Sequence, residues 1–438
     1  MISRIRPYFN EKYFNAISNF DPEITRDEYC LELTKQLHKY YPKAHTFEFF
    51  NYGRNALGAG LDLLDIHEND EIILPCFTCS TVLDPILKRR IIPKLVDINF
   101  DFSFKIEQVE KVITKKTKAI MVTHFFGIPT NLLEIKKIAE IFDLYIIEDC
   151  AHTFCQQTSF SVGSIGDIAF TSHGNEKPLS LGNGGILIIN NYEKSGNIYT
   201  ITSKIPNESL YNEKCSFLSL ACFDYATETL RYNYFIGTSS FYNYIVDNPQ
   251  KFQSLVDDVI HYHELDIIYN SFNDNFQKRK NVNSLQKMCN IFKRGIFTPH
   301  QHDPKLMNTF LLQLFLKILP EIDRVNEARN KKGRIYIDNL SGNSDFFFPQ
   351  DRRAPYLRYS ILCKKPALTH SLINKLVREK FEVGNYNWGQ TLNHILKIKE
   401  KFEISEYICD NVINLPCYPS LHDEEINKIS QIINNFTN

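Results

Sequence analysis

A lysine and a carboxylate near the ends of two apolar segments are the residues of this sequence best suited to covalent chemistry. Lys177 stands in S-H-G-N-E-K-P-L-S-L-G-N-G-G at 172–185, between an expected strand and a glycine-rich turn. Asp149 ends the run I-I-E-D, and His152 follows it. A lysine amine can form a Schiff base, and a carboxylate can hold the protonated nitrogen of a pyridine ring. Pyridoxal phosphate chemistry requires both, so this pair predicts a site for that cofactor.

The surroundings of the lysine decide whether its amine can react. A free lysine has a pKa of about 10.4, so it is protonated at pH 7 unless its environment disfavours the charge. The apolar strand end before Lys177 predicts such an environment. A released amine there can move a proton from the α-carbon of an amino donor, while Asp149 keeps the pyridine ring an acceptor of electrons.

Alternating strands and helices must position these residues. Apolar strands separated by helices of this length predict right-handed crossovers and a mainly parallel sheet with helices on both faces, that is, an α/β fold. Ligands bind such sheets beyond the carboxyl ends of the strands, where Asp149 and Ser172 are expected. The expected strands are 71–75, 93–99, 119–124, 144–149, 168–172 and 184–190, and the expected helices are 51–64, one ending near Arg90, 105–113 and 131–142.

The predicted helix at 51–64 begins with Gly53, Arg54 and Asn55. Free backbone N–H groups and the positive end of the helix dipole make such a start suitable for a phosphate. From this segment alone, an ordinary helix N-terminus is the favoured interpretation.

The remaining chain predicts an N-terminal arm and a second, smaller domain. A long amphipathic helix is expected to lead from the large domain into a C-terminal α+β domain with a closing helix after L-P-C-Y-P-S-L-H-D-E-E-I. The segment 191–306 carries no interpretable motif and is expected to be an elaboration of the large domain. The predicted limits are 1–45 for the arm, 46–306 for the large domain and 307–438 for the rest, with helices at 247–264, 307–330 and 368–380 and a strand at 356–363.

Composition excludes several classes of protein. The 438 residues carry 50 Lys plus Arg and 51 Asp plus Glu, so no net field attracts nucleic acid. No apolar stretch approaches the roughly 20 residues of a membrane span, and no signal peptide is evident, so we expect a cytoplasmic protein. Cys76 and Cys79 lack a second pair at zinc spacing, so no metal site is predicted. No G-x-G-x-x-G opens a helix after the first strand, which disfavours a dinucleotide site.

Several segments in the same order resemble the DegT/DnrJ/EryC1/StrS family of sugar aminotransferases, fold-type-I enzymes that use pyridoxal phosphate. The resemblance covers about 50–190 and 307–430. The segments are G-R-N-A-L at 53–57, E-N-D-E-I-I-L-P-C-F-T at 68–78, K-A-I-M-V-T-H-F-F-G-I-P-T at 118–130, E-D-C-A-H at 148–152, G-S-I-G-D at 163–167, K-P-L-S-L-G-N-G-G at 177–185 and the C-terminal L-P-C-Y-P-S-L-H-D-E-E-I at 415–426.

The resemblance implies a role for each site residue. Lys177 would form the Schiff base, Asp149 would hold the pyridine nitrogen, and His152 would flank the ring hydroxyl. The residues implied at the phosphate are Gly53, Arg54, Asn55 and Ser172. His124 and Trp388 are expected either to face the substrate or to pack, and Cys79 stands where the family often has an aromatic residue that stacks on the cofactor.

The resemblance implies an aminotransferase that moves an amino group, with glutamate as expected donor, to a nucleotide-linked keto sugar in amino-sugar or surface polysaccharide biosynthesis, in a homodimer. Two alternatives stay open. Some relatives are sugar dehydratases that use the same cofactor, but they carry histidine in place of the lysine, and Lys177 argues against that reaction. The second alternative is a homologue without catalysis that serves as a binding or regulatory subunit, which the unusual 191–306 segment keeps open.

Overall fold

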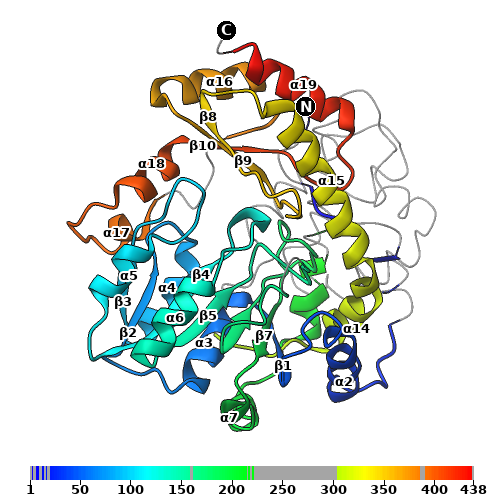
Figure 1. Ribbon diagram of the computed structural model, residues 1–438. Coiled ribbons are helices and arrows are strands. Elements are labelled where there is room, and N and C mark those ends of the chain that lie inside the picture. The colour runs from blue at the N-terminus through cyan, green and yellow to red at the C-terminus, as the bar shows by residue number, and fades with distance from the viewer. Residues whose placement is uncertain are drawn as a thin grey trace, which may run out of the picture.

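The computed structural model describes residues 2, 6–8, 12, 13, 16, 20–157, 161–214, 216, 217, 220, 303–384 and 390–436. The helix predicted at 247–264, most of the 191–306 segment and Trp388 lie outside these residues. In the described part of the chain, a seven-stranded sheet and a three-stranded sheet form two layered units, which Figure 1 shows one above the other. Among the same residues, no helix has the length and apolar character that a membrane span needs.

The large sheet is mainly parallel, as predicted. Its strands, in spatial order, are β1 (Thr46–Phe50), β7 (Gly185–Ile189), β6 (Ile168–Phe170), β5 (Tyr145–Asp149), β4 (Thr117–Thr123), β2 (Glu71–Pro75) and β3 (Ile92–Val96). The five strands from β6 to β3 are mutually parallel. β7 runs antiparallel to both β6 and β1, because a hairpin and not a helical crossover joins β6 to β7. The sequence analysis did not predict β1.

Helices cover both faces of this sheet, and alternate residues of one strand pack into different cores. Leu74 of β2 belongs to the core beneath α3 (Gly53–Leu63) and α4 (Leu83–Lys88). Its neighbour Ile73 belongs to the core beneath α5 (Ile106–Val112) and α6 (Leu133–Phe142). This period-two division explains why the strands are apolar throughout, since each is buried on both faces. The fold class predicted from the sequence is therefore confirmed.

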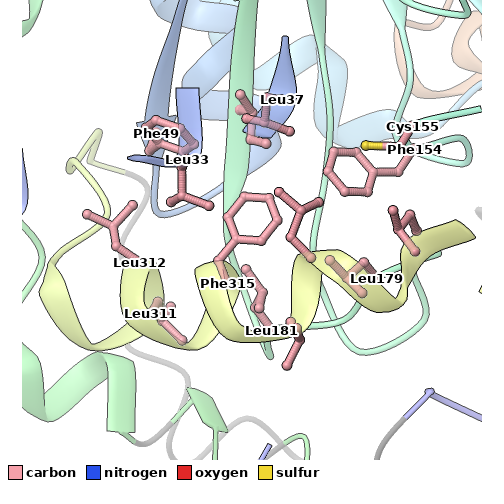
Figure 2. Close-up of a cluster of buried hydrophobic side chains, with 14 of the residues drawn as sticks. Leu33, Leu37, Phe49, Phe154, Cys155, Leu179, Leu181, Leu311, Leu312 and Phe315 are labelled. Carbon is pink, nitrogen blue, oxygen red and sulfur yellow. The ribbon is translucent and has the colours of Figure 1, made fainter. Parts of the chain in front are cut away.

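A further core packs on β1, β7 and β6, on the face opposite α3, under α2 (Arg26–Leu37) and α14 (Thr309–Ile318). Phe315 of α14 packs among apolar residues that come from the hairpin between β6 and β7, including Leu179 and Leu181 (Figure 2). All three side chains are fully buried. The segment that follows Lys177 is thus fixed by a helix from the C-terminal half of the chain.

The single helix predicted at 307–330 is wrong. The structure has α14, then a 3₁₀ turn at Leu319–Glu321, then α15 (Ile322–Leu340). Pro320 lies in that turn, and proline inside an α-helix removes one backbone hydrogen bond and clashes with the preceding turn. α15 therefore starts afresh after the proline and continues ten residues beyond the predicted end.

The smaller unit is an antiparallel sheet of β10 (Val412–Leu415), β9 (Tyr359–Cys363) and β8 (Phe346–Phe347), packed against α16 (Pro366–Arg378) and α19 (Asp423–Asn434). The predicted closing helix with acidic residues in its first turn is confirmed as α19. Two short helices, α17 (Leu392–Ile395) and α18 (Glu403–Asn411), return to the large unit. α18 touches it through Asp97, which accepts hydrogen bonds from the backbone of Ile404 and Ser405.

A backbone contact holds the smaller unit over the carboxyl ends of the large sheet. The N–H of Leu357, just before β9, donates to the carbonyl of Phe126 at 2.7 Å. Gly127 makes this approach possible, because a Cβ there would lie 2.6 Å from the carbonyl oxygen of Pro355. The φ of Gly127 is +92°, which also favours glycine. The segment just before β9 therefore covers the edge of the sheet where ligands were expected.

Candidate active site

The ends of three neighbouring parallel strands bring several predicted residues together. Asp149 is the last residue of β5, and its carbonyl accepts a hydrogen bond from the backbone N–H of His124, which follows β4. Ser172 follows β6. Lys177 reaches the same edge from the hairpin between β6 and β7. Asp149, Lys177 and His152 lie close enough for the lysine's charge to affect the other two groups.

Residues 171–184, which we call the lysine loop, form an extension of the β6–β7 hairpin. Its base is closed by hydrogen bonds from His173 N to Gly184 O and from Leu181 N to His173 O, at 2.9 and 2.8 Å. At its tip, the N–H of Lys177 donates to Gly174 O, and the Ser180 hydroxyl donates to the Lys177 carbonyl. The backbone that carries the lysine is therefore rigid, while its side chain is half-buried.

His173 anchors the lysine loop from inside the protein. Its Nδ1 donates to the Leu179 carbonyl at 2.9 Å, and its Nε2 accepts from the Thr171 hydroxyl at 3.0 Å. The ring packs between Phe154 and Phe315, with centroid distances of 4.7 and 5.0 Å. Burial lowers the pKa of His173 to about 4, so the ring is neutral at pH 7. The sequence analysis gave this histidine no role, and no pattern in the sequence marks it.

The charges around the amine are mixed. Burial lowers the pKa of Lys177, and Arg358 lowers it further, whereas Cys79, Asp149 and Glu176 raise it. Burial also raises the pKa of Asp149, although the N–H of Ala151 and the charge of Lys177 oppose that effect. A buried carboxylate of this kind stays ionised when a cation lies beside it. The protonated nitrogen of a pyridine ring is a cation of suitable size.

His152 presents a neutral ring to the same space. Its Nδ1 accepts a hydrogen bond from the backbone N–H of Phe126 at 3.2 Å, so the hydrogen is assigned to Nε2. Its ring stacks on that of Phe126, with centroids 5.7 Å apart. Burial, with the charges of Lys177 and Arg358, lowers its pKa well below the ordinary value. The Nε2–H can therefore donate to an oxygen at any pH near 7.

The start of α3 lies against Ser172, as a phosphate site would require. A Cβ on Gly53 would lie 2.6 Å from the Thr171 carbonyl oxygen and 3.2 Å from the Ser172 Cβ, so only glycine allows this contact. The backbone N–H groups of the first helical turn and the serine hydroxyl thus share one corner of the site. The sequence analysis placed Gly53 and Ser172 together at a phosphate, and the structure brings them together.

The side chains of Arg54 and Asn55 turn away from this corner. The Arg54 guanidinium pairs with Asp84 at 3.0 Å and lies over the Tyr52 ring. The Asn55 amide donates to Asn51 Oδ1 at 2.7 Å. Both side chains line a cavity of about 820 Å³ between α3, α4 and residues 201–205. Any contact of Arg54 with a phosphate would therefore come from its backbone N–H, because the N–H of Asn55 already donates to the Tyr52 carbonyl at 3.0 Å. The role of both residues stays a prediction.

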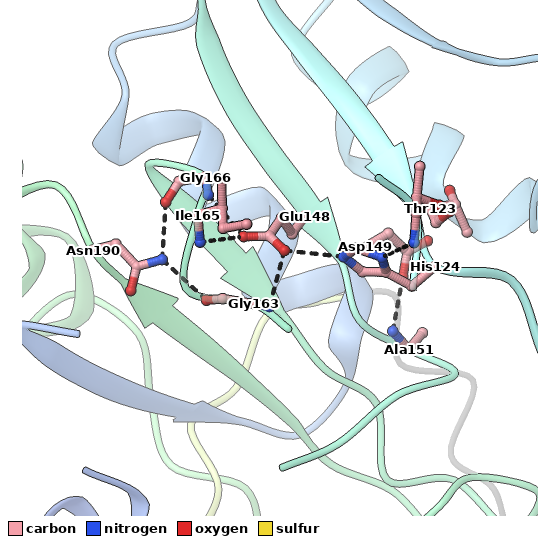
Figure 3. A network of polar contacts seen from close by, with 10 residues as sticks. Thr123, His124, Glu148, Asp149, Ala151, Gly163, Ile165, Gly166 and Asn190 are labelled. Carbon is pink, nitrogen blue, oxygen red and sulfur yellow. Dashed lines mark hydrogen bonds and ion pairs between the residues drawn. The ribbon is translucent and has the colours of Figure 1, made fainter. Parts of the chain in front are cut away.

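The sequence analysis overlooked Glu148, which is fully buried next to Asp149 (Figure 3). Its carboxylate accepts hydrogen bonds from the N–H groups of Gly163, Ile165 and Gly166, at 2.7 to 2.9 Å. It also accepts from Nε2 of His124 at 3.0 Å. Burial alone would raise the pKa of Glu148, but these donors lower it. A carboxylate inside an apolar strand, on the face opposite Asp149, is the signal that could have revealed it.

His124, Glu148 and Cys150 have potential ligand atoms within 4.8 Å of one another, but their chemistry does not suit a metal. Nδ1 of His124 accepts the Thr130 N–H at 3.0 Å, and both oxygens of Glu148 are already occupied by N–H donors. Burial raises the pKa of Cys150 well above its ordinary value, so the thiol stays protonated. The group instead fixes the strand that ends at Asp149 and packs His124 inside the protein.

Arg358, which the sequence analysis also overlooked, reaches the site from the smaller unit. It lies just before β9, is buried, and pairs through Nη2 with Glu176 Oε2 at 2.6 Å. Glu176 directly precedes Lys177. A charged residue beside the buried run Y-S-I-L-C was the available signal, but it could not show which strand end the arginine would face.

Comparisons with known proteins identify a family for this chain. The model of the DegT/DnrJ/EryC1/StrS aminotransferase family matches residues 10–209 and 306–434. The chain is 35% identical to GDP-perosamine synthase of Escherichia coli O157:H7 over 32% of its own length and 38% of that protein's. It is 35% identical to the UDP-N-acetyl-3-dehydro-alpha-D-glucosamine 3-aminotransferase of Acidithiobacillus ferrooxidans over 31% of its length and 38% of that protein's. The chain therefore spans less than half the length of these curated relatives.

Solved structures share the whole fold. The Helicobacter pylori aminotransferase PseC, described as involved in pseudaminic acid biosynthesis, matches with a TM-score of 0.70 at 15% identity and covers 99% of this chain and 98% of its own. An E. coli GDP-4-keto-6-deoxy-D-mannose-3-dehydratase with hydrated pyridoxal phosphate matches with a TM-score of 0.69 at 16% identity and 99% coverage of both chains. At these identities the likeness extends to the fold and not to the reaction.

Proposed function

This chain belongs to the DegT/DnrJ/EryC1/StrS aminotransferase family, and we propose that it is a pyridoxal-phosphate-dependent aminotransferase that transfers an amino group from an amino acid to a keto sugar. The observation that carries the proposal is the placement of a half-buried lysine beside a buried aspartate at the carboxyl ends of the sheet. The names of both curated relatives, which refer to GDP- and UDP-linked sugars, support a nucleotide-linked sugar as acceptor. Glutamate is the proposed donor.

The residues at this edge fit the cofactor. Asp149 would hold its pyridine nitrogen, Nε2 of His152 would donate to its ring hydroxyl, and Lys177 would bind it covalently. The first turn of α3 and Ser172 would take the phosphate, since the tight contact at Gly53 places them side by side. When bound, pyridoxal phosphate supplies an electron sink for the carbanion that forms at the donor's α-carbon.

The chain's own groups supply proton transfer and charge. Burial and Arg358 favour the neutral form of the Lys177 amine, which can then accept a proton from the α-carbon of the donor and later return one to the acceptor carbon. Asp149 keeps its negative charge opposite the ring nitrogen. His152 stays neutral and donates one hydrogen bond. The rigid base of the lysine loop keeps the amine within reach of the reacting carbon.

The dehydratase alternative rests on fold neighbours that are named as dehydratases. A sugar dehydratase of this kind, by the resemblance, carries histidine in place of the lysine. Lys177 occupies that position here, and His173 is committed to Thr171 and Leu179 inside the protein. These contacts favour the aminotransferase. A homologue without catalysis would not need a lysine of lowered pKa beside a buried carboxylate.

The test is spectroscopic. The purified protein with pyridoxal phosphate should show the visible absorption of a lysine-bound cofactor, and L-glutamate should convert it to the absorption of the amino form. Lys177→Ala should abolish the conversion. The control is Lys43→Ala, which changes an exposed lysine distant from Lys177 in the sequence and should leave the conversion intact. A protein that stays colourless after reconstitution would contradict the proposal. A panel of nucleotide-linked keto sugars with the amino form would then identify the acceptor.

We further propose that the chain works as a cytoplasmic homodimer in amino-sugar or surface polysaccharide biosynthesis. The family resemblance is the support for this assembly. Light scattering after size exclusion, at several protein concentrations, tests it: a mass of one chain at every concentration would contradict the dimer.

A further inference from the structure

Two buried arginines of the smaller unit lie close enough for the charge of Arg358 to affect Arg329, and Arg358 contacts the lysine loop through Glu176. Arg358 pairs with Glu176, whose side chain is 38% exposed, whereas that of Arg358 is 9% exposed. Arg329 of α15 donates to the carbonyls of Leu357 and Cys417, and among the described residues its Nε has no hydrogen-bond partner. Burial and the charge of Arg358 lower the pKa of Arg329 to about 10. Positive charge is therefore in excess at this place.

Arg358 lies close to the reacting amine. Its charge lowers the pKa of both Lys177 and His152, and it is the cation that acts on both. An amino acid whose nitrogen replaces the Lys177 amine has its α-carboxylate only two bonds away from that nitrogen. Because Arg358 pairs with Glu176, the residue directly before Lys177, its guanidinium lies in the neighbourhood of that amine, and its planar fork matches a carboxylate with two parallel hydrogen bonds.

In the proposed reaction, an arginine at this place must function with two different substrates. The site must accept an amino acid in one half of the cycle and a sugar in the other, and the sugar carries no carboxylate beside the reacting carbon. A mostly buried guanidinium is more favourable with an anion beside it than without one. Glu176 can supply this anion, because it directly precedes Lys177 in the sequence and its side chain is partly exposed to solvent.

We propose that Arg358 binds the α-carboxylate of the amino donor and that Glu176 occupies Arg358 whenever no donor carboxylate is present. This inference rests on the proposed aminotransferase function and adds how the donor is recognised. Donor binding turns the Glu176 carboxylate out into solvent, and donor release lets it return. The exchange replaces one ion pair with another, so Arg358 keeps an anion throughout the cycle.

The first experiment measures donor recognition in the cofactor-loaded protein. L-Glutamate and its α-amide, isoglutamine, are titrated while conversion to the amino form is followed by absorption. Wild type should strongly prefer glutamate. Arg358→Leu should raise the glutamate concentration for half-conversion about 10- to 150-fold, as expected for loss of a charged hydrogen-bonded contact, and should abolish the preference over the amide.

The matched control is Arg352→Leu, which removes an exposed ion pair with Asp338 in the same unit and should leave both titrations unchanged. Arg358→Lys keeps the charge without the fork and should give an intermediate result. It also keeps the test decisive if the leucine variant does not load cofactor.

Glu176→Gln probes the other half of the exchange. Without a resident carboxylate to displace, half-conversion should need about 2- to 5-fold less glutamate, in line with the small worth of a partly exposed pair. The return reaction with a keto sugar should slow, because Glu176 no longer supplies a carboxylate to Arg358.

Binding of glutarate, which has carboxylates but no amine, gives a readout without turnover. Calorimetry on the loaded protein should show weaker binding to Arg358→Leu and tighter binding to Glu176→Gln. Unchanged glutamate and glutarate affinities in Arg358→Leu would overturn the proposal, as would a defect confined to the keto sugar, which would assign Arg358 to the sugar or its phosphates. Failure of wild type itself to respond to any amino acid would instead refute the proposed function.

Discussion

Two carboxylates close to the candidate site are held in opposite ways. Glu148 is fully buried, and its partners are backbone N–H groups of one short loop together with His124. Glu176 is partly exposed, and its partner is the side chain of an arginine from another unit of the molecule. Backbone donors in a closed loop cannot follow a moving carboxylate, whereas a side-chain pair at the solvent edge can separate. The first carboxylate therefore belongs to a fixed frame and the second to an adjustable contact.

The contrast is also energetic. Removing one member of a buried, fully bonded charge leaves the others unsatisfied, and the loss is several times larger than that of a partly exposed pair. Stability should thus be sensitive to Glu148 and insensitive to Glu176, while donor specificity should show the reverse. Four experiments, in order of falling effect, test this division.

Glu148→Ala should have the largest effect on stability. It leaves His124 and the N–H groups at Gly163, Ile165 and Gly166 without an acceptor, so we expect the free energy of unfolding to fall by about 3–5 kcal/mol. Urea unfolding followed by circular dichroism measures it. The control is Glu140→Ala, which removes an exposed pair with Lys136 and should change stability by about 0.5 kcal/mol or less. A loss below about 1 kcal/mol for Glu148→Ala would contradict the fixed frame.

Gly127→Ala should come next, because it tests whether backbone contact and not the ion pair seats the smaller unit. The added Cβ would meet Pro355 O and Leu357 N at 2.6 and 2.7 Å, with φ at +92°. We expect a loss of about 2–4 kcal/mol from strain and overpacking. Gly342→Ala, where nothing lies within 4 Å, is the matched control and should be near neutral. Equal stability of both variants would argue that the units are seated by side chains alone.

The free energy of unfolding should fall in acid, because Glu148 then becomes protonated. The folded state holds the pKa of Glu148 below its ordinary value of 4.5, so this group stabilises the fold above that pH and loses its contribution as pH falls through the folded value. Wild type should therefore lose stability below about pH 4.5 more steeply than Glu148→Gln, which has no such proton to bind. Unfolding curves at several pH values from 7 to 3 measure both slopes, and parallel slopes would contradict the assignment.

Glu176→Gln should have the smallest effect on stability. Its side chain is partly in solvent, so loss of the pair with Arg358 should lower the free energy of unfolding by about 1 kcal/mol or less. Urea unfolding of this variant beside Glu148→Ala completes the comparison. A loss as large as that of Glu148→Ala would show that both carboxylates belong to the frame.

The sequence predicted most of the large sheet. β2 was predicted with its exact bounds, and β5 and β7 within one residue at each end, because each contains a short run of apolar β-branched residues or leucine next to turn residues. β1 was not predicted, since its partner β7 lies more than a hundred residues later and local pattern carries no such information. Pro320 carried enough information to split the predicted long helix, but the apolar periodicity on both sides concealed the break.

For the site, the family's order of motifs placed Lys177, Asp149, His152 and Ser172 in one region, which the structure also brings together. Glu148 and Arg358 were overlooked for different reasons. Glu148 lies beside Asp149 in the sequence, but alternation in a strand directs it to the other face, where its partners come from a loop that only the fold brings near. Arg358 depends on how the smaller unit is placed over the sheet, and composition and periodicity do not encode that placement.

The pair between Glu176 and Arg358 joins positions 182 residues apart, which has a consequence for the time course of folding. Domains tend to fold as units and from the N-terminus during synthesis. The lysine loop is therefore synthesised, and its strands can pair, well before the arginine leaves the ribosome. A nascent chain at that stage carries Lys177 without Arg358, which lowers the pKa of its amine and is proposed to bind the donor. Donor recognition is thus expected only after the smaller unit has been synthesised.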